Sequence, residues 1–134
     1  VGMISMDYEF INYKNAKLTA SDYRFTDENK DIETIYRATH NFRFGGELRF
    51  GPGYFRGGYS FYASPFATEV PNVDADKSII SAGVGLRNRF FFIDATYSYA
   101  KMQESYYPYV PGIIDGAILT SNNNSVRVTL GFRF

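Results

Sequence analysis

The sequence predicts an all-β fold, an antiparallel up-and-down transmembrane β-barrel whose strands follow one another as a meander. Three observations predict it. Apolar and polar residues alternate over six windows, each close to the roughly 9–11 residues that a tilted strand needs to cross a bilayer. Long and short connections alternate between these windows, as they do in outer-membrane barrels. One face of the windows carries essentially no Asp, Glu, Lys or Arg.

The composition indicates one β-rich domain, residues 1–134, and excludes several classes of function. Aromatic residues make up 19% of the chain, and its 14 basic residues balance 14 acidic ones. This balance argues against nucleic acid as a partner, because nucleic-acid binders carry a basic excess. The absence of cysteine excludes a disulfide scaffold, a thiolate metal site and a cysteine nucleophile. We expect no cofactor and no metal site.

The first three windows, residues 2–12, 38–50 and 54–63, each read as a strand with one apolar face. The first window alternates Ser5, Asp7 and Glu9 with the apolar side chains of Ile4, Met6, Tyr8 and Phe10. The apolar face of the second window consists of Ala38, His40, Phe42, Phe44, Gly46, Leu48 and Phe50. That of the third consists of Phe55, Gly57, Tyr59, Phe61 and Ala63.

The last three windows, residues 78–87, 90–100 and 125–134, repeat this alternation. The fourth has an apolar face of Ile80, Ala82, Val84 and Leu86. The fifth has one of Phe91, Ile93, Ala95, Tyr97 and Tyr99. The sixth has one of Val126, Val128, Leu130, Phe132 and Phe134. Aromatic residues gather near the window ends, which is typical of the girdles at the two membrane interfaces.

The connections predict which end of the sheet lies outside. Residues 13–37, 64–77 and 101–124 form long loops, whereas Gly51-Pro52-Gly53 and Asn88-Arg89 form short turns. Long loops are extracellular and short turns periplasmic in outer-membrane barrels. Residues 26–37 could form a short helix with Thr26 as N-cap. Within 101–124 we interpret Asn122-Asn123-Asn124 as a turn, and 105–110 and 117–119 as poor candidates for additional strands.

The opposite face of the windows carries charges of both signs, and Arg is nearly its only basic residue. In a membrane barrel these side chains would line the lumen, where Arg suits paired, confined contacts. We expect them to form a structural ladder of cross-strand pairs made of Asp7, Glu9, Arg43, Glu47, Arg49, Arg56, Arg87, Asp94, Arg127 and Arg133. The alternative is a soluble lipid-binding β-barrel with its apolar face turned inward.

Two groups of residues could suggest other chemistry, and both do so weakly. His40 lies on the apolar face, but no Ser shares that face in the second or third window to act as a nucleophile. We therefore expect packing or hydrogen bonding for His40 and no enzyme activity. Four acids of the first long loop could bind Ca²⁺ or cations bridged to lipopolysaccharide, although their spacing lacks an EF-hand pattern and we expect a solvated loop. They are Asp22, Asp27, Glu28 and Asp31.

Two stretches resemble known proteins. Residues 127–134, Arg-Val-Thr-Leu-Gly-Phe-Arg-Phe, resemble the C-terminal assembly signal of bacterial outer-membrane proteins, which ends in an aromatic residue after apolar residues at alternate positions. This resemblance implies recognition of the signal by the barrel-assembly machinery. The matching side chains here are Val126, Val128, Leu130, Phe132 and Phe134.

The blocks 7–10, 40–50, 54–62, 81–87 and 91–97 resemble the C-terminal third of FadL/TodX-type barrels in the form common in Bacteroidetes. Examples are His-Asn-Phe-Arg-Phe-Gly-Gly-Glu-Leu-Arg-Phe at 40–50 and Phe-Phe-Ile-Asp-Ala-Thr-Tyr at 91–97. The resemblance implies a bacterial outer-membrane location and passive uptake of hydrophobic small molecules such as fatty acids. That family has a larger barrel and an N-terminal plug, which this chain lacks, so it assigns no site residue here.

The visible strands are too few for a closed single-chain barrel, because such barrels have about eight strands or more. We therefore expect the chain to be the C-terminal portion of a longer barrel, or to close its open strand edges by self-association. The expected partners are membrane lipid or detergent, the assembly machinery and a hydrophobic small-molecule ligand. A small structural or pore-forming outer-membrane barrel remains an alternative function.

Overall fold

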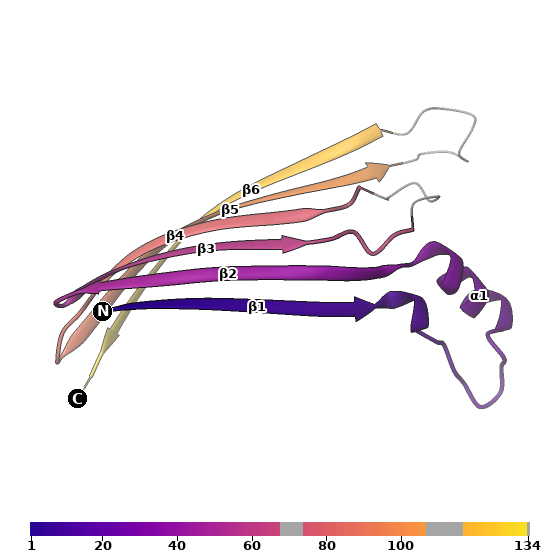
Figure 1. The fold of residues 1–134 in the computed structure, drawn as a ribbon, viewed down its shortest axis with the longest axis horizontal. Helices are drawn as coiled ribbons and strands as arrows, with labels where there is room; N and C mark the ends of the chain where they lie inside the picture. The colour runs from indigo at the N-terminus through magenta and orange to yellow at the C-terminus, as the bar shows by residue number, and fades with distance from the viewer. Residues whose placement is uncertain (68–73, 107–116, 134) are drawn as a thin grey trace.

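The computed structural model describes residues 1–67, 74–106 and 117–133, and they form one antiparallel sheet with a short helix at one end (Figure 1). Each strand pairs with its neighbours in sequence, in the order β1-β2-β3-β4-β5-β6. The strands are β1 (Gly2–Asn12), β2 (Ala38–Phe50), β3 (Gly53–Tyr62), β4 (Lys77–Arg87), β5 (Phe91–Tyr106) and β6 (Ala117–Phe132). The predicted all-β meander is confirmed. The sheet is open, with β1 and β6 as its edges within the described residues.

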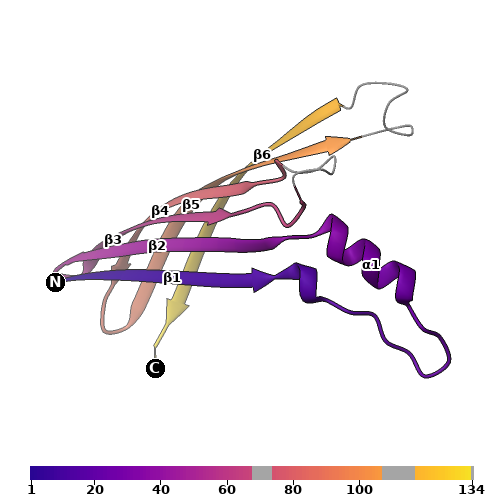
Figure 2. The same ribbon diagram turned by 45° about the vertical axis from the view of Figure 1, so that its right-hand side comes forward.

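Long and short connections lie at opposite ends of the sheet (Figure 2). The β2–β3 and β4–β5 turns lie at the end that also holds both chain termini, and the helix lies at the other end. Gly51 has φ of +57° in the first of these turns, a conformation that favours glycine. The Arg87 amide donates to the Pro52 carbonyl at 2.7 Å, so the two turns are joined. The predicted alternation of long and short connections is thus confirmed.

The predicted helix in the first long connection exists, but its start differs from the prediction. Helix α1 (Thr26–Ile35) follows the short 3-10 helix η1 (Tyr13–Asn15). Its N-cap is Phe25, not Thr26, because the Phe25 carbonyl accepts the first helical hydrogen bond, from the Asn29 amide at 3.0 Å. No side chain caps the helix, and Asp27 and Glu28 in the first turn favour it through the helix dipole.

Strands β5 and β6 extend well into the segment 101–124 that we predicted to be a loop. Asn122–Asn124 do not form a turn, because they pair with β5 in the register Lys101 to Asn122. Polar cross-strand contacts replace the apolar alternation here: the Tyr97 hydroxyl donates to Asn124 Oδ1 at 2.6 Å and the Tyr99 hydroxyl to Asn122 Oδ1 at 2.8 Å. Ser105 and residues 117–119 lengthen β5 and β6, and residues 107–116 lie outside the described residues.

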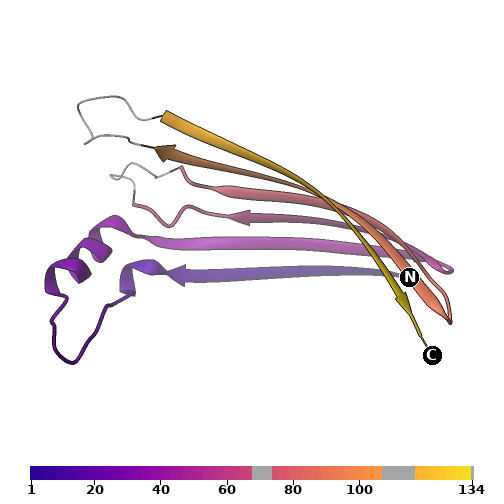
Figure 3. The same ribbon diagram turned by 180° about the vertical axis from the view of Figure 1, so that it is seen from behind.

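The two faces of the sheet differ in chemistry and in burial. The apolar face carries Ile4, Met6, Val84, Leu130 and the other apolar side chains of the six windows, and the polar face carries the predicted ladder. Large side chains of the apolar face are exposed, with Ile4 at 89% and Met6 at 71%. Among the described residues Tyr54 is the one buried hydrophobic side chain, and it lies on the polar face. The sheet is curved along its strands (Figure 3). Side chains of the polar face are less exposed than those of the apolar face, which indicates that the polar face is the more crowded one.

Candidate functional site

The polar face holds two clusters of paired charges, of which the first lies toward the long connections. Arg43 of β2 contacts two carboxylates of β1, Asp7 Oδ2 at 3.3 Å and Glu9 Oε2 at 2.6 Å. The Asn41 side chain also donates to Glu9 Oε2, at 3.1 Å. One guanidinium group therefore forms ion pairs with two carboxylates, which leaves this cluster on β1 with one negative charge in excess.

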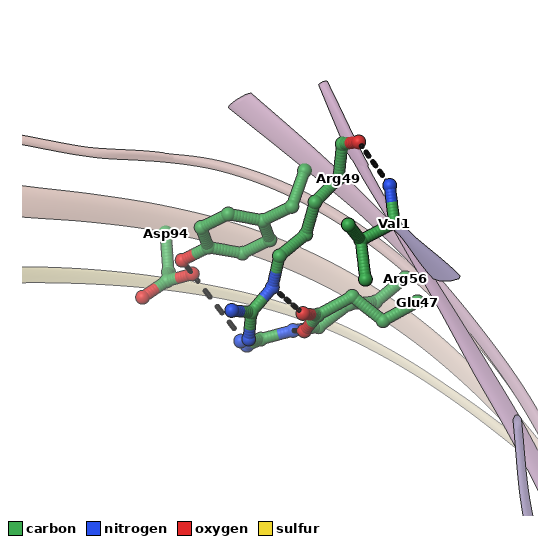
Figure 4. Close-up of polar contacts among 6 residues, drawn as sticks. Val1, Glu47, Arg49, Arg56 and Asp94 are labelled. Atoms are coloured by element: carbon green, nitrogen blue, oxygen red, sulfur yellow. Dashed lines mark hydrogen bonds and ion pairs between the residues drawn. The ribbon is translucent and has the colours of Figure 1, made fainter. Parts of the chain in front are cut away.

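The second cluster lies toward the short turns and joins β2, β3 and β5 (Figure 4). Glu47, only 6% exposed, is held by the guanidinium groups of Arg49 and Arg56, with Arg56 Nε at 2.5 Å from Glu47 Oε2. Arg56 Nη1 also lies 3.6 Å from Asp94 Oδ1. Glu47 is buried, whereas the Arg49 and Arg56 side chains are 55% and 44% exposed. Hydrogen bonds between ionised partners are stronger than those between neutral groups.

We expect Glu47→Gln to destabilise the fold clearly more than Asp7→Asn. Glu47→Gln removes the charge that neutralises Arg49 and Arg56 at a buried position, whereas Asp7 is exposed and shares its one guanidinium with Glu9. Loss of such an exposed pair costs about 0–1 kcal/mol. Urea unfolding of both variants in detergent micelles measures the difference. Equal midpoints for the two variants would contradict the assigned role of Glu47.

Aromatic rings on the polar face lie over glycines of the neighbouring strand, a contact that sequence reasoning missed. A Cβ built on Gly85 would collide with the Tyr54 ring, and one built on Gly131 with the Phe92 ring. Both pairs are directly opposite in register. The Tyr54 hydroxyl donates to Asp94, and the Arg56 guanidinium lies 4.4 Å from the Tyr54 ring centre. The sequence shows only that an aromatic residue occupies a polar-face position. Which glycine lies opposite it is known only once the strand register is known.

Three arginines of the predicted ladder have no ion pair among the described residues. Arg87 instead lies 5.8 Å from the ring centre of Tyr54 and 5.7 Å from that of Phe92. Arg127 is on the edge strand β6, opposite Thr96, and Arg133 follows the end of that strand. The structure thus brings seven of the ten predicted ladder residues into two clusters and leaves the positive charge of β6 unpaired.

A row of small residues separates the two charge clusters. The registers connect one polar-face position on every strand, namely Ser5, Gly45, Gly58, Ser81, Ser98 and Ser125. The Ser98 and Ser125 hydroxyls are 2.8 Å apart. A Cβ on Gly45 would lie 2.8 Å from Ser5 Oγ, so the glycine gives room to the neighbouring hydroxyl.

The apolar face carries aromatic clusters near both ends. Toward the long connections the Tyr8 ring lies 5.2 Å from Phe42, and its hydroxyl is 2.7 Å from His40 Nδ1. Toward the short turns Phe50 and Phe55 are 6.4 Å apart. His40 thus packs against aromatic rings and forms a hydrogen bond with Tyr8. Packing or hydrogen bonding is the role that we expected for it from the sequence.

The side chains of the predicted assembly signal form an exposed row on β6. Val126, Val128, Leu130 and Phe132 are all on the apolar face and largely exposed. Phe134 lies outside the described residues. The row occupies an edge strand, where its backbone and side chains are accessible together.

The first two long connections contact each other at their end of the sheet. The Arg37 amide donates to the Pro65 carbonyl at 2.8 Å, and the rings of Tyr36 and Phe66 stack at 5.5 Å. In the first connection, Asn29 holds the backbone of Leu18 through two hydrogen bonds, of 2.7 and 3.1 Å. The first two long connections are therefore joined to each other.

The acids of the first long connection lie apart from these contacts. Asp22, Asp27 and Asp31 are exposed. The Tyr23 hydroxyl donates to Glu28 Oε1 at 3.0 Å, and this bond together with the charge of Glu28 raises the pKa of Tyr23. In the described part of the chain no three His, Asp or Glu side chains are arranged to hold a metal ion. No helix in the same ranges is long and apolar enough to cross a membrane.

Comparison with known proteins yields no match to a family model, a curated protein or a solved structure. The resemblance to FadL/TodX-type barrels therefore stays a prediction.

Proposed function

We propose that this chain forms part of a bacterial outer-membrane β-barrel that takes up hydrophobic small molecules passively. The observation that carries the proposal is the exposed apolar face, which extends over all six strands opposite a charged face. Contact with lipid chains keeps such an apolar face out of water, as in the lipid-facing band of membrane barrels. In water, an exposed apolar surface of this extent is an interaction or aggregation site. The aromatic clusters near both ends of that face match the two membrane interfaces.

The choice of hydrophobic solutes is supported by the sequence resemblance to FadL/TodX-type barrels. A pore for small polar solutes is the second candidate, and the polar face favours it. Its paired charges and row of serines and glycines are compatible with a water-filled lumen. A soluble lipid-binding barrel is the least supported alternative, because the crowded face of the sheet is the polar one.

Reconstitution into liposomes distinguishes these functions. The refolded chain is inserted into vesicles, and two fluxes are measured: entry of a fluorescent long-chain fatty acid and leakage of a small hydrophilic dye. We expect faster fatty-acid entry with little dye leakage. Dye leakage without faster fatty-acid entry would favour the pore. A chain that stays monodisperse without detergent and does not enter vesicles would overturn both membrane functions.

A further inference from the structure

We propose that the polar face binds a small oxyanion, a carboxylate or a phosphate group, at the exposed guanidinium groups of Arg49, Arg56 and Arg87. This inference rests on the proposed function only in that the polar face must border a space open to solutes. The three arginines belong to β2, β3 and β4, and the side chains that hold them to β2, β3 and β5. Each of these strands is paired on both sides, so no residue of the site lies on an edge strand.

The acids of this anion site are buried or nearly so, whereas its arginines are exposed. The side chains of Glu47 and Asp94 are 6% and 17% exposed. Arg49, Arg56 and Arg87 are all exposed. The surface that the site offers to a solute is therefore formed by positive groups, although carboxylates lie within the same cluster.

Three arginines and two carboxylates leave the anion site with one positive charge in excess. Both carboxylates already have partners, because Glu47 contacts two arginines and Asp94 contacts Arg56 and the Tyr54 hydroxyl. The other charge cluster, around Arg43, has the opposite excess, with one arginine for two carboxylates. Of the two clusters, the one toward the short turns is thus the one whose field favours an anion.

Arg87 is the arginine best placed to contact the anion. Its guanidinium carbon lies 5.8 Å from the ring centre of Tyr54 and 5.7 Å from that of Phe92. No carboxylate of the described residues pairs with it. A guanidinium group has five N–H donors and no acceptor, and contact with aromatic rings leaves these donors free for an oxyanion. Because the rings already hold the side chain, less conformational entropy is lost when the anion binds.

Shared partners connect the other two arginines to Arg87. The Tyr54 ring that contacts Arg87 also lies 4.4 Å from the guanidinium carbon of Arg56. Glu47 in turn joins Arg56 to Arg49 (Figure 4). Both arginines contact Glu47 through Nε, which leaves the Nη donors of Arg49 and Nη2 of Arg56 available. Forked guanidinium donors suit the oxygens of carboxylate and phosphate groups.

Equilibrium dialysis with radiolabelled inorganic phosphate tests the anion site. The chain is refolded in a non-ionic detergent, because an anionic detergent would compete for the arginines. Sodium chloride is kept at physiological strength, so that long-range attraction is screened. We expect saturable phosphate binding by the unaltered chain and roughly tenfold weaker binding or less by Arg87→Gln, the effect of losing a hydrogen bond to a charged group. No saturable binding by the folded, unaltered chain would overturn the proposal.

Arg89→Gln is the matched control, because it removes the same charge at the same end of the sheet but from the β4–β5 turn. Its phosphate affinity should stay close to that of the unaltered chain. Equal losses for Arg87→Gln and Arg89→Gln would show attraction by net charge alone and overturn the site. Arg87→Lys keeps the charge without the planar fork and should bind phosphate with intermediate affinity. Urea unfolding of each variant confirms that it is folded.

Competition against the bound phosphate identifies the source of the oxyanion. Octanoate and octanol have the same chain length, and only octanoate has a carboxylate. Displacement by octanoate alone would support the proposal with the carboxylate of an apolar acid as ligand, and displacement by neither would support it with free phosphate. Displacement by octanol would overturn it, because octanol has no charge. Absent phosphate binding with intact fatty-acid entry into vesicles would reject only this inference, and intact binding without such entry would reject only the proposed solute.

Discussion

Tyr54→Ala is expected to destabilise the folded protein by about 3–5 kcal/mol, the usual cost of removing a buried aromatic ring. The Tyr54 side chain is 5% exposed, and its ring fills the space above Gly85. Its removal also exposes Asp94, which loses the Tyr54 hydroxyl, and Arg56, which loses the ring beneath it. Urea unfolding of the refolded chain in micelles measures the loss.

Tyr54→Phe is the matched control for this prediction. It keeps the ring over Gly85 and removes only the hydroxyl that bonds Asp94, so we expect a cost of about 1–3 kcal/mol, typical of a hydrogen bond to a charged group. Gly85→Ala should approach the effect of Tyr54→Ala, because the added methyl group occupies the position of the ring. A loss for Tyr54→Ala no larger than that for Tyr54→Phe would show that the ring contributes nothing.

Val128→Arg is expected to cost about 2–4 kcal/mol of stability in the membrane, the penalty for a lipid-facing Arg near the midplane of a barrel. Val128 is exposed on the apolar face of β6 and lies opposite Ala95. The next residue, Thr129, points to the polar face, where charges are accommodated. Thr129→Arg should therefore cost much less, although it differs from Val128→Arg by a single position.

Folding into vesicles, followed by urea titration, compares the two arginine variants. The opposite order, with Thr129→Arg the more damaging, would contradict the assignment of the two faces. A soluble barrel whose apolar face is its core would give the same order as a membrane barrel, because Val128→Arg places a charge in apolar surroundings in both cases. Repeating the pair in water without lipid or detergent distinguishes them, because only a soluble barrel keeps the large penalty for Val128→Arg there. Equal effects in vesicles would show that neither face of β6 meets lipid.

The strands and their faces could be predicted because alternation along a strand is a local property of the chain. Successive side chains of a strand point to opposite sides, so each window reveals its two environments without knowledge of its neighbours. The windows 2–12 and 38–50 match β1 and β2 residue for residue. The prediction was wrong where this signal ends: Asn122–Asn124 pair within β6 through polar cross-strand contacts that alternation does not report.

The sequence by itself determined six alternating strands, the order of long and short connections, and the separation of an apolar from a charged face. Only the tertiary structure decided which charges meet. Asp94 contacts Tyr54 from 40 residues away, and Arg127 lies opposite Thr96 rather than a carboxylate. The physical reason is register: a shift of two residues in one strand keeps every side chain on its face and changes every partner.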